Sequence, residues 1–112
     1  YRCVQQNEMR TIREAVHTDL VETRKVYEWV SELCVSLGAS SSDMVPFEKY
    51  ANAAESLISP SSAARALAAG APNIERVDKL VQSIAKNTGK SLQSIDETVQ
   101  LVDEWLEKNR AQ

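Results

Sequence analysis

Apolar residues recur at every third or fourth position over the last forty residues of the chain. The run comprises Ile74, Val77, Val81, Ile84, Leu92, Ile95, Val99, Val102 and Leu106, with Thr88 filling one position. This spacing places the side chains on one face of a helix, because an α-helix completes a turn in about 3.6 residues. The pattern therefore predicts a long amphipathic helix over residues 73–110.

One short stretch inside this segment argues against a single helix. Asn87, Thr88 and Gly89 are poor helix formers, and Gly costs about 1 kcal/mol relative to Ala in a helix interior. Ser94 and Glu97 also have the spacing of a capping box, which marks a helix start. The apolar pattern nevertheless keeps its phase across Gly89. We therefore favour one continuous, kinked helix, with two helices folded back at Gly89 as the alternative.

A second helical pattern covers residues 3–37. Its apolar positions are Met9, Ile12, Val16, Leu20, Val26, Val30, Leu33 and Leu37. Asp19 and Thr23 interrupt the pattern, which indicates either packing against more than one neighbour or a loosened middle. Gly38 is placed to end this helix, because glycine readily adopts the positive φ of a helix C-terminus.

The intervening residues 38–72 predict two short helices. Ser42 and Asp43 lie just upstream of Pro46, and Ser59 directly precedes Pro60. This order is expected at a helix start and indicates helices over 46–58 and 60–69. The resulting fold is all-α: an antiparallel hairpin of two long helices, 3–37 and 73–110, with a small head formed by the two short ones. We expect an elongated bundle or a coiled-coil assembly. A compact bundle is the alternative if the chain folds back at Gly89.

Length and composition are consistent with a single helical domain. The chain has 112 residues, of which 43% are hydrophobic and 26% charged, enough for one modest core. Its few Gly, Pro and aromatic residues favour helices over sheet. Because the sequence starts at Tyr1 rather than Met, we interpret residues 1–112 as a domain from a larger protein.

The charge pattern argues against two classes of partner. The net charge is −3, and each of the segments 1–37, 38–72 and 73–112 has one more acidic than basic residue. No segment therefore forms a basic surface for nucleic acid or anionic lipid. No apolar run approaches the roughly 18 residues that span a bilayer. We expect no nucleic-acid partner, no membrane partner and a cytoplasmic location.

The two cysteines lie far apart in the predicted fold. Cys3 and Cys34 are separated by 31 residues of one predicted helix, or roughly 46 Å at 1.5 Å per residue. A disulfide between them within one helix is excluded by this distance. Reduced thiols are the favoured interpretation. An antiparallel homodimer that pairs Cys3 with Cys34 is the alternative.

The motifs that resemble catalytic or cofactor sites are incomplete. Glu14 and His17 have the Glu-x-x-His spacing of di-iron bundles, but such a site needs the pair twice and His17 is the only histidine. Residues 89–91 read Gly-Lys-Ser, the end of a phosphate-binding loop, but Ile84 stands where that motif needs its first glycine. We expect no metal, no cofactor and no enzymatic activity.

The remaining function class is protein binding. We expect a protein–protein interaction or oligomerisation domain of a scaffolding, cytoskeletal or trafficking protein. It would associate with itself, as a homodimer or higher oligomer, or bind a helical partner. The predicted interface residues are Trp29, Val30, Leu33, Leu92, Ile95, Val99, Val102, Trp105 and Leu106.

Two alternatives remain. In the first, the chain is a stalk whose head, residues 38–72, binds a filament or another target. In the second, less favoured than the first, a compact helical bundle encloses an apolar ligand, which requires the chain to fold back at Gly89. The sequence leaves open the identity of the partner, the orientation of the association and any phosphorylation of serine.

Overall fold

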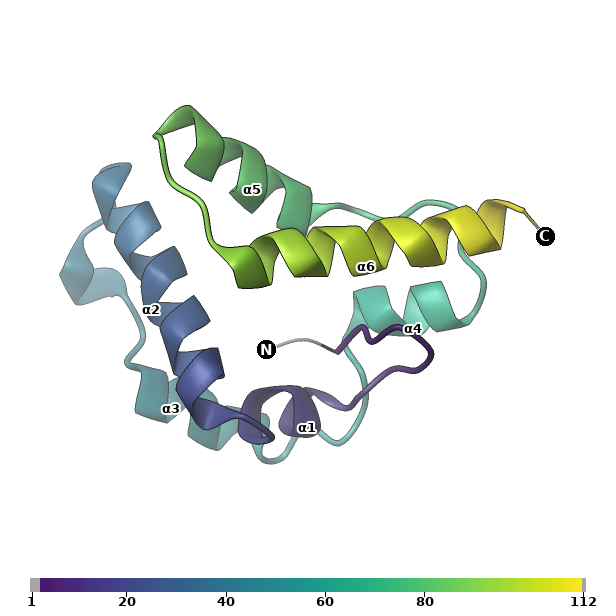
Figure 1. Ribbon diagram of the computed structural model, residues 1–112. Helices are drawn as coiled ribbons and strands as arrows, with labels where there is room; N and C mark the ends of the chain where they lie inside the picture. The colour runs from purple at the N-terminus through teal and green to yellow at the C-terminus, as the bar shows by residue number, and fades with distance from the viewer. Residues whose placement is uncertain (1–2, 112) are drawn as a thin grey trace.

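The last forty residues form two helices rather than one. The computed structural model describes residues 3–111, in which α5 (Val77–Asn87) and α6 (Gln93–Arg110) are joined by a turn and lie side by side (Figure 1). Gly89 in this turn has a φ of 75°, a left-handed conformation that costs other residues free energy. The predicted continuous helix over 73–110 is therefore wrong, and the alternative of a fold-back at Gly89 is confirmed.

The first predicted long helix is also wrong, because it is interrupted at Thr18 and Asp19. Residues 3–10 are not helical, and the chain then forms α1 (Ile12–His17) and α2 (Leu20–Ser36). Asp19 caps α2 by accepting a hydrogen bond from the backbone N–H of Glu22 at 3.1 Å. The buried Thr23 hydroxyl lies 2.9 Å from the Val16 carbonyl and 2.8 Å from the Asp19 carbonyl. The two polar residues that interrupt the apolar pattern therefore stabilise the break.

The two predicted short helices exist, but they do not form a head. After a single 3-10 turn η1 (Ser41–Asp43), the chain forms α3 (Phe47–Ala54) and α4 (Ser62–Ala68). Both are shorter than predicted. The helix α3 packs against α1 and α2, whereas α4 packs against α6 (Figure 1). The segment 38–72 is therefore divided between two parts of the molecule.

Most of the buried apolar residues accordingly form two clusters, whereas Ala15, Val26, Leu33, Ala85 and Val99 belong to neither. The α1/α3 cluster consists of Val16, Phe47, Ala51 and Ala54, with Ile12, Tyr27 and Tyr50 packed against it. The α4/α6 cluster consists of Val4, Ala64, Leu67, Val102 and Leu106, with Cys3, Met9, Ile74, Leu101 and Trp105 packed against it. Each cluster is too small to cover all of its own helices.

Polar side chains fix the helices of each part to their neighbours. Trp105 donates its indole N–H to the Gln5 carbonyl at 2.6 Å, which holds the N-terminal segment on α6. The Asn109 amide donates to the carbonyls of Leu67 and Ala71, at 3.0 and 2.9 Å, and so ties α6 to the end of α4. A hydrogen bond from the Ser94 hydroxyl to the Glu22 carboxylate joins α6 to α2.

The overall dimensions follow from the short helices. The Cα radius of gyration is 14.5 Å and the principal extents are 45 × 34 × 20 Å, whereas a 38-residue helix alone would span roughly 57 Å. The elongated hairpin is therefore not formed. The all-α prediction is confirmed over residues 3–111, which contain no strand, only an isolated antiparallel bridge between Val4 and Met9.

We predict that Gly89→Ala lowers the free energy of unfolding by about 1–2 kcal/mol, because alanine is strained at a φ of 75°. A Cβ at this position would meet no atom within 4 Å, so the cost is conformational rather than steric. Urea titration followed by circular dichroism measures it. Gly89→Asn should lower the free energy of unfolding less than Gly89→Ala, because Asn tolerates this conformation better. If Gly89→Ala were as stable as the wild type, the fold-back would be contradicted.

We predict that Thr23→Val destabilises the protein by about 1–3 kcal/mol, because the buried Val16 carbonyl loses its hydroxyl partner. Valine has nearly the same shape, so the loss reports the hydrogen bond rather than a cavity. Thermal unfolding measures the change. Thr23→Ser, which keeps the hydroxyl and removes one methyl group, separates the two contributions. Equal stability of wild type and Thr23→Val would show that the break does not depend on this bond.

Candidate functional site

An apolar cleft of about 520 Å³ lies between the α1/α3 cluster and the α4/α6 cluster. It is lined by Cys3, Val4, Ile12, Ala15, Val16, Tyr50, Leu57, Ser61, Ala63, Leu67, Ile74, Glu75, Val77, Asp78, Thr98 and Val102. Most of these side chains are apolar. The volume falls within the range of about 300–1,000 Å³ that is usual for ligand pockets.

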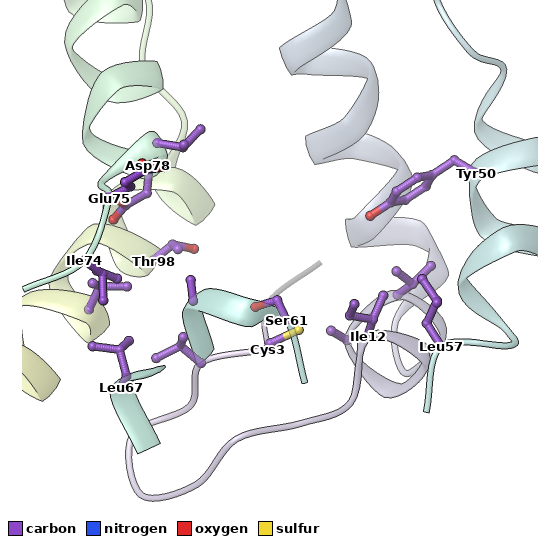
Figure 2. A pocket seen from close by; sticks show the side chains of 16 residues that line it. Cys3, Ile12, Tyr50, Leu57, Ser61, Leu67, Ile74, Glu75, Asp78 and Thr98 are labelled. Atoms are coloured by element: carbon purple, nitrogen blue, oxygen red, sulfur yellow. The ribbon is translucent and has the colours of Figure 1, made fainter. Parts of the chain in front are cut away.

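The cleft has two walls of different character (Figure 2). One wall carries Ile12 of α1 together with Leu57 and Tyr50 from α3 and the segment after it. The opposite wall carries Ile74, the two carboxylates of Glu75 and Asp78, and Thr98 of α6 (Figure 2). The first wall belongs to the α1/α3 part and the second to the α5–α6 hairpin and the segment that leads into it.

Small side chains explain why the two walls do not close on each other. Ala15 of α1 and Ala63 of α4 both line the cleft, and a single methyl group fills little of the space between helices. The helix α4 is rich in alanine, and its Leu67 is buried in the α4/α6 cluster rather than bridging the cleft. The sequence thus supplies too little side-chain volume here for one merged core.

The rims of the cleft carry apolar side chains that face solvent. Val77 lines the cleft and is 63% exposed, and Leu80 follows it one helical turn along α5 and is also exposed. Leu57 lines the other wall, and its neighbour Ile58 is 73% exposed. Exposed apolar residues therefore lie close in the chain to cleft residues of both walls.

Ionic contacts fix the start of α5 beside the cleft. Arg76 pairs with Asp78 at 2.9 Å and with Asp103 of α6 at 2.8 Å, and its side chain is only 16% exposed. The hydrogen bond to Asp78 is the largest influence that raises the pKa of Arg76. Glu75 differs from Asp78, because no described residue forms a hydrogen bond or an ion pair with its carboxylate.

Tyr50 supplies a neutral hydroxyl to the opposite wall. Its ring stacks on Tyr27 with 4.8 Å between centroids and also lies near Phe47, and its hydroxyl points into the space between the walls (Figure 2). Burial is the main cause that raises the pKa of Tyr50, with smaller contributions from Cys3 and Tyr27. The hydroxyl therefore stays protonated at neutral pH.

Two other hollows flank α2, and neither matches the cleft. One of about 330 Å³ is lined by Thr23, Val26, Tyr27, Val30, Ser31, Cys34, Met44 and Tyr50. Another of about 530 Å³ is lined by Glu28, Ser31, Glu32, Val35, Ser36, Ser41 and Met44. The first is smaller, and five of the seven residues that line the second are Glu or Ser. The cleft between the clusters therefore offers an apolar partner the most surface to bury.

The structure uses many of the predicted interface residues inside the chain. Leu33, Val99, Val102 and Leu106 are buried, and Trp29, Val30, Leu92, Ile95 and Trp105 are half-buried. Of the nine, Val102 alone lines the cleft. The four buried residues have little area to offer a partner. The role of all nine as an interface stays a prediction.

Sequence reasoning missed most of the cleft residues. Tyr50 and Leu57 fall within the predicted helix 46–58 and Ile74 within the predicted helix 73–110, and the predicted hairpin gave them no common surface. The available signals were Gly89, which breaks the last helix, and Asp19, which breaks the first. Taken together they predict short helices, and short helices leave gaps where their packing faces diverge.

The residues considered for metal binding or catalysis have other roles. Glu14 accepts hydrogen bonds from the Thr11 backbone N–H and hydroxyl, at 3.2 and 3.0 Å, which lower the pKa of Glu14. The Glu14 backbone N–H in turn donates to the Thr11 hydroxyl oxygen at 3.0 Å, which completes a capping box at α1. The His17 ring nitrogen Nε2 lies 2.8 Å from the Ala51 carbonyl. Within residues 3–111, no three His, Cys, Asp or Glu side chains are arranged to hold a metal ion.

Both cysteines are free thiols and half-buried. Cys3 lies in the non-helical N-terminal segment, not on a helix with Cys34 as predicted. No helix in the described part of the chain has the length and apolar character needed to cross a bilayer.

Comparisons of this chain with protein-family models, with curated proteins and with solved structures find no match. Function is therefore inferred from the cleft itself.

We predict that Asp103→Asn reduces stability at neutral pH and has less effect in acid. The hydrogen bond from Arg76 is the main cause that lowers the pKa of Asp103 below its usual 3.8. A carboxyl group with a lowered folded-state pKa stabilises the fold above 3.8, and that contribution disappears as the pH falls through the lowered value. The effect should be small, because Asp103 is partly exposed to solvent.

Urea unfolding of wild type and Asp103→Asn at pH 7 and near pH 3 measures this dependence. The difference between the two proteins should shrink in acid. A constant difference at both pH values would show that the carboxylate charge does not hold α5 on α6.

Proposed function

We propose that this chain is a non-enzymatic protein–protein interaction domain whose cleft accepts apolar side chains from a helix of a partner protein. The observation that carries the proposal is the division of the core into two clusters with an apolar cleft between them. Side chains inserted there would contact both clusters and unite them in one core. Burial of apolar area would supply the binding free energy.

The exposed rims favour a helix over a small molecule. A small ligand would fill the cleft and leave Leu80 and Ile58, which do not line it, in water. An amphipathic helix that lies across the opening would cover these side chains as well, as in helix-in-groove recognition. Large apolar side chains that face solvent around a cleft are typical of an interaction surface.

A second candidate is the apolar ligand that we considered as an alternative from the sequence. That alternative required a fold-back at Gly89, which the structure contains. The cleft volume of about 520 Å³ is also suitable for a small molecule. The stalk-and-tip alternative gains no such support, because α3 and α4 do not form one head.

The expected affinity is modest. Three large apolar side chains, fully buried, would contribute roughly 5–9 kcal/mol. Association costs an estimated 4 kcal/mol or more in lost translational and rotational freedom. Rim contacts must therefore contribute to any complex tighter than about millimolar, and a reversible complex of roughly micromolar affinity is the natural expectation.

We predict that Ala63→Trp prevents binding of an amphipathic helical peptide, because the indole would fill the cleft that Ala63 lines. The probe is a peptide of about 15 residues, long enough to form a helix, with one stripe of leucines. Two-dimensional NMR titration should shift the amide signals of Ile12, Thr98 and other cleft residues in the wild type. The same titration of Ala63→Trp should leave them unchanged.

Ala68→Trp is the matched control. Ala68 lies on the same helix and is exposed, but it does not line the cleft. This variant should bind the peptide as the wild type does. Equal binding by both variants, or peptide-induced shifts confined to another face, would overturn the proposal. If decanol shifts the amide signals of the cleft residues and the peptide does not, the result would favour the small-ligand alternative.

A further inference from the structure

The charged residues of the cleft all have one sign. Glu75 and Asp78 line it, whereas no Lys, Arg or His occurs among the described residues of its walls. The other polar groups are neutral hydroxyls and the thiol of Cys3. A partner with an acidic residue beside its apolar face would therefore meet repulsion here, and a partner with a basic residue would meet attraction.

The two carboxylates are not equally available. Asp78 is already paired with Arg76, which also binds Asp103. Glu75 has no hydrogen bond or ion pair with any described residue. It precedes α5 and lies between Ile74, which packs against the α4/α6 cluster, and Arg76, which is held by two carboxylates. The backbone on both sides of Glu75 is thus fixed while its carboxylate can accept hydrogen bonds.

A local structural role is the competing explanation for Glu75. Acidic residues near a helix N-terminus interact favourably with the helix dipole, and α5 has no side-chain cap at its start. That role would make Glu75 contribute to stability. It would not make the cleft discriminate between partners of opposite charge, so the two roles can be separated by experiment.

We infer that the partner segment is a basic amphipathic helix, with a Lys or Arg beside its apolar stripe that pairs with Glu75 at the wall of the cleft. This inference rests on the proposed function and specifies the chemistry of the partner. The aliphatic part of such a side chain would pack against the apolar rim at Val77, while its charged end reaches the carboxylate. Charge complementarity thus selects among apolar helices that the cleft could otherwise accept.

Two peptides of about 15 residues test the inference. They share the same leucine stripe and differ only in the residues that flank it, which are Lys in one and Glu in the other. Isothermal titration calorimetry at low salt should show that the Lys peptide binds wild type roughly fivefold more tightly or better. The preference should fall as salt is added, because exposed charges are screened.

Glu75→Gln should remove most of this preference, and Glu107→Gln should keep it. Glu107 is exposed on α6 and does not line the cleft, so both variants change the net charge equally and differ only in position. Equal loss of preference in both variants would overturn the inference in favour of a general charge effect. A change in unfolding free energy of Glu75→Gln without a change in preference would assign Glu75 to the helix dipole.

The same experiment separates the two proposals. Binding of both peptides to the cleft with equal affinity would overturn the basic partner and leave the helix-binding function in place. Absence of cleft shifts with either peptide would overturn both.

Discussion

The division of a small supply of apolar side chains between two clusters determines the form of this molecule. Each cluster is built around one pair of helices, α1 with α3 and α4 with α6. Where the two meet, the chain supplies alanines such as Ala15 and Ala63, and their methyl groups leave a cleft rather than a filled core. Close packing normally removes such gaps. The cleft is thus the direct consequence of where the small residues lie.

Polar contacts keep the two parts in place around this gap. The hydrogen bond between Ser94 and Glu22 joins α6 to α2 and so connects the two parts, and the Arg76–Asp103 ion pair holds α5 on α6 within one of them. Such contacts stabilise an arrangement without filling the space between the helices, because each acts at a single point. They leave the cleft walls apolar, apart from the carboxylates of Glu75 and Asp78 and a few neutral polar groups. A partner helix with a basic flank is the occupant that this combination of surfaces suits best.

The sequence predicted the helical class and several helix ends, but not the lengths of the helices. The period of apolar residues is helical on both sides of Gly89, and residues 88–92 continue it although they form a turn. Two helices folded into a hairpin also need a row of apolar residues on their facing sides. The continuous spacing of apolar residues across Gly89 therefore did not distinguish a hairpin from one long helix. Gly89 was the better signal of the break between α5 and α6, since glycine readily adopts the positive φ that occurs there. Asp19 and Thr23 likewise marked the break between α1 and α2.

The cleft could not be predicted, because it depends on which helices pack together. Tyr50, Leu57 and Ile74 come from three separate segments, and only the tertiary arrangement places them around one space. Several predicted interface residues pack within the chain. Val99 and Leu106 are buried within the chain, and amphipathic spacing alone does not say whether a stripe packs inside a chain or between chains.

Methyl NOE spectroscopy on the free protein tests the division of the core most directly. The account predicts contacts within each cluster, such as Leu67 with Val102 and Val16 with Ala51, and none between the two sets across the cleft. Direct NOEs between the methyl groups of Val16 and those of Leu67 or Val102 would show that the two clusters form one closed core. In that case the cleft, and the binding function proposed for it, would be contradicted.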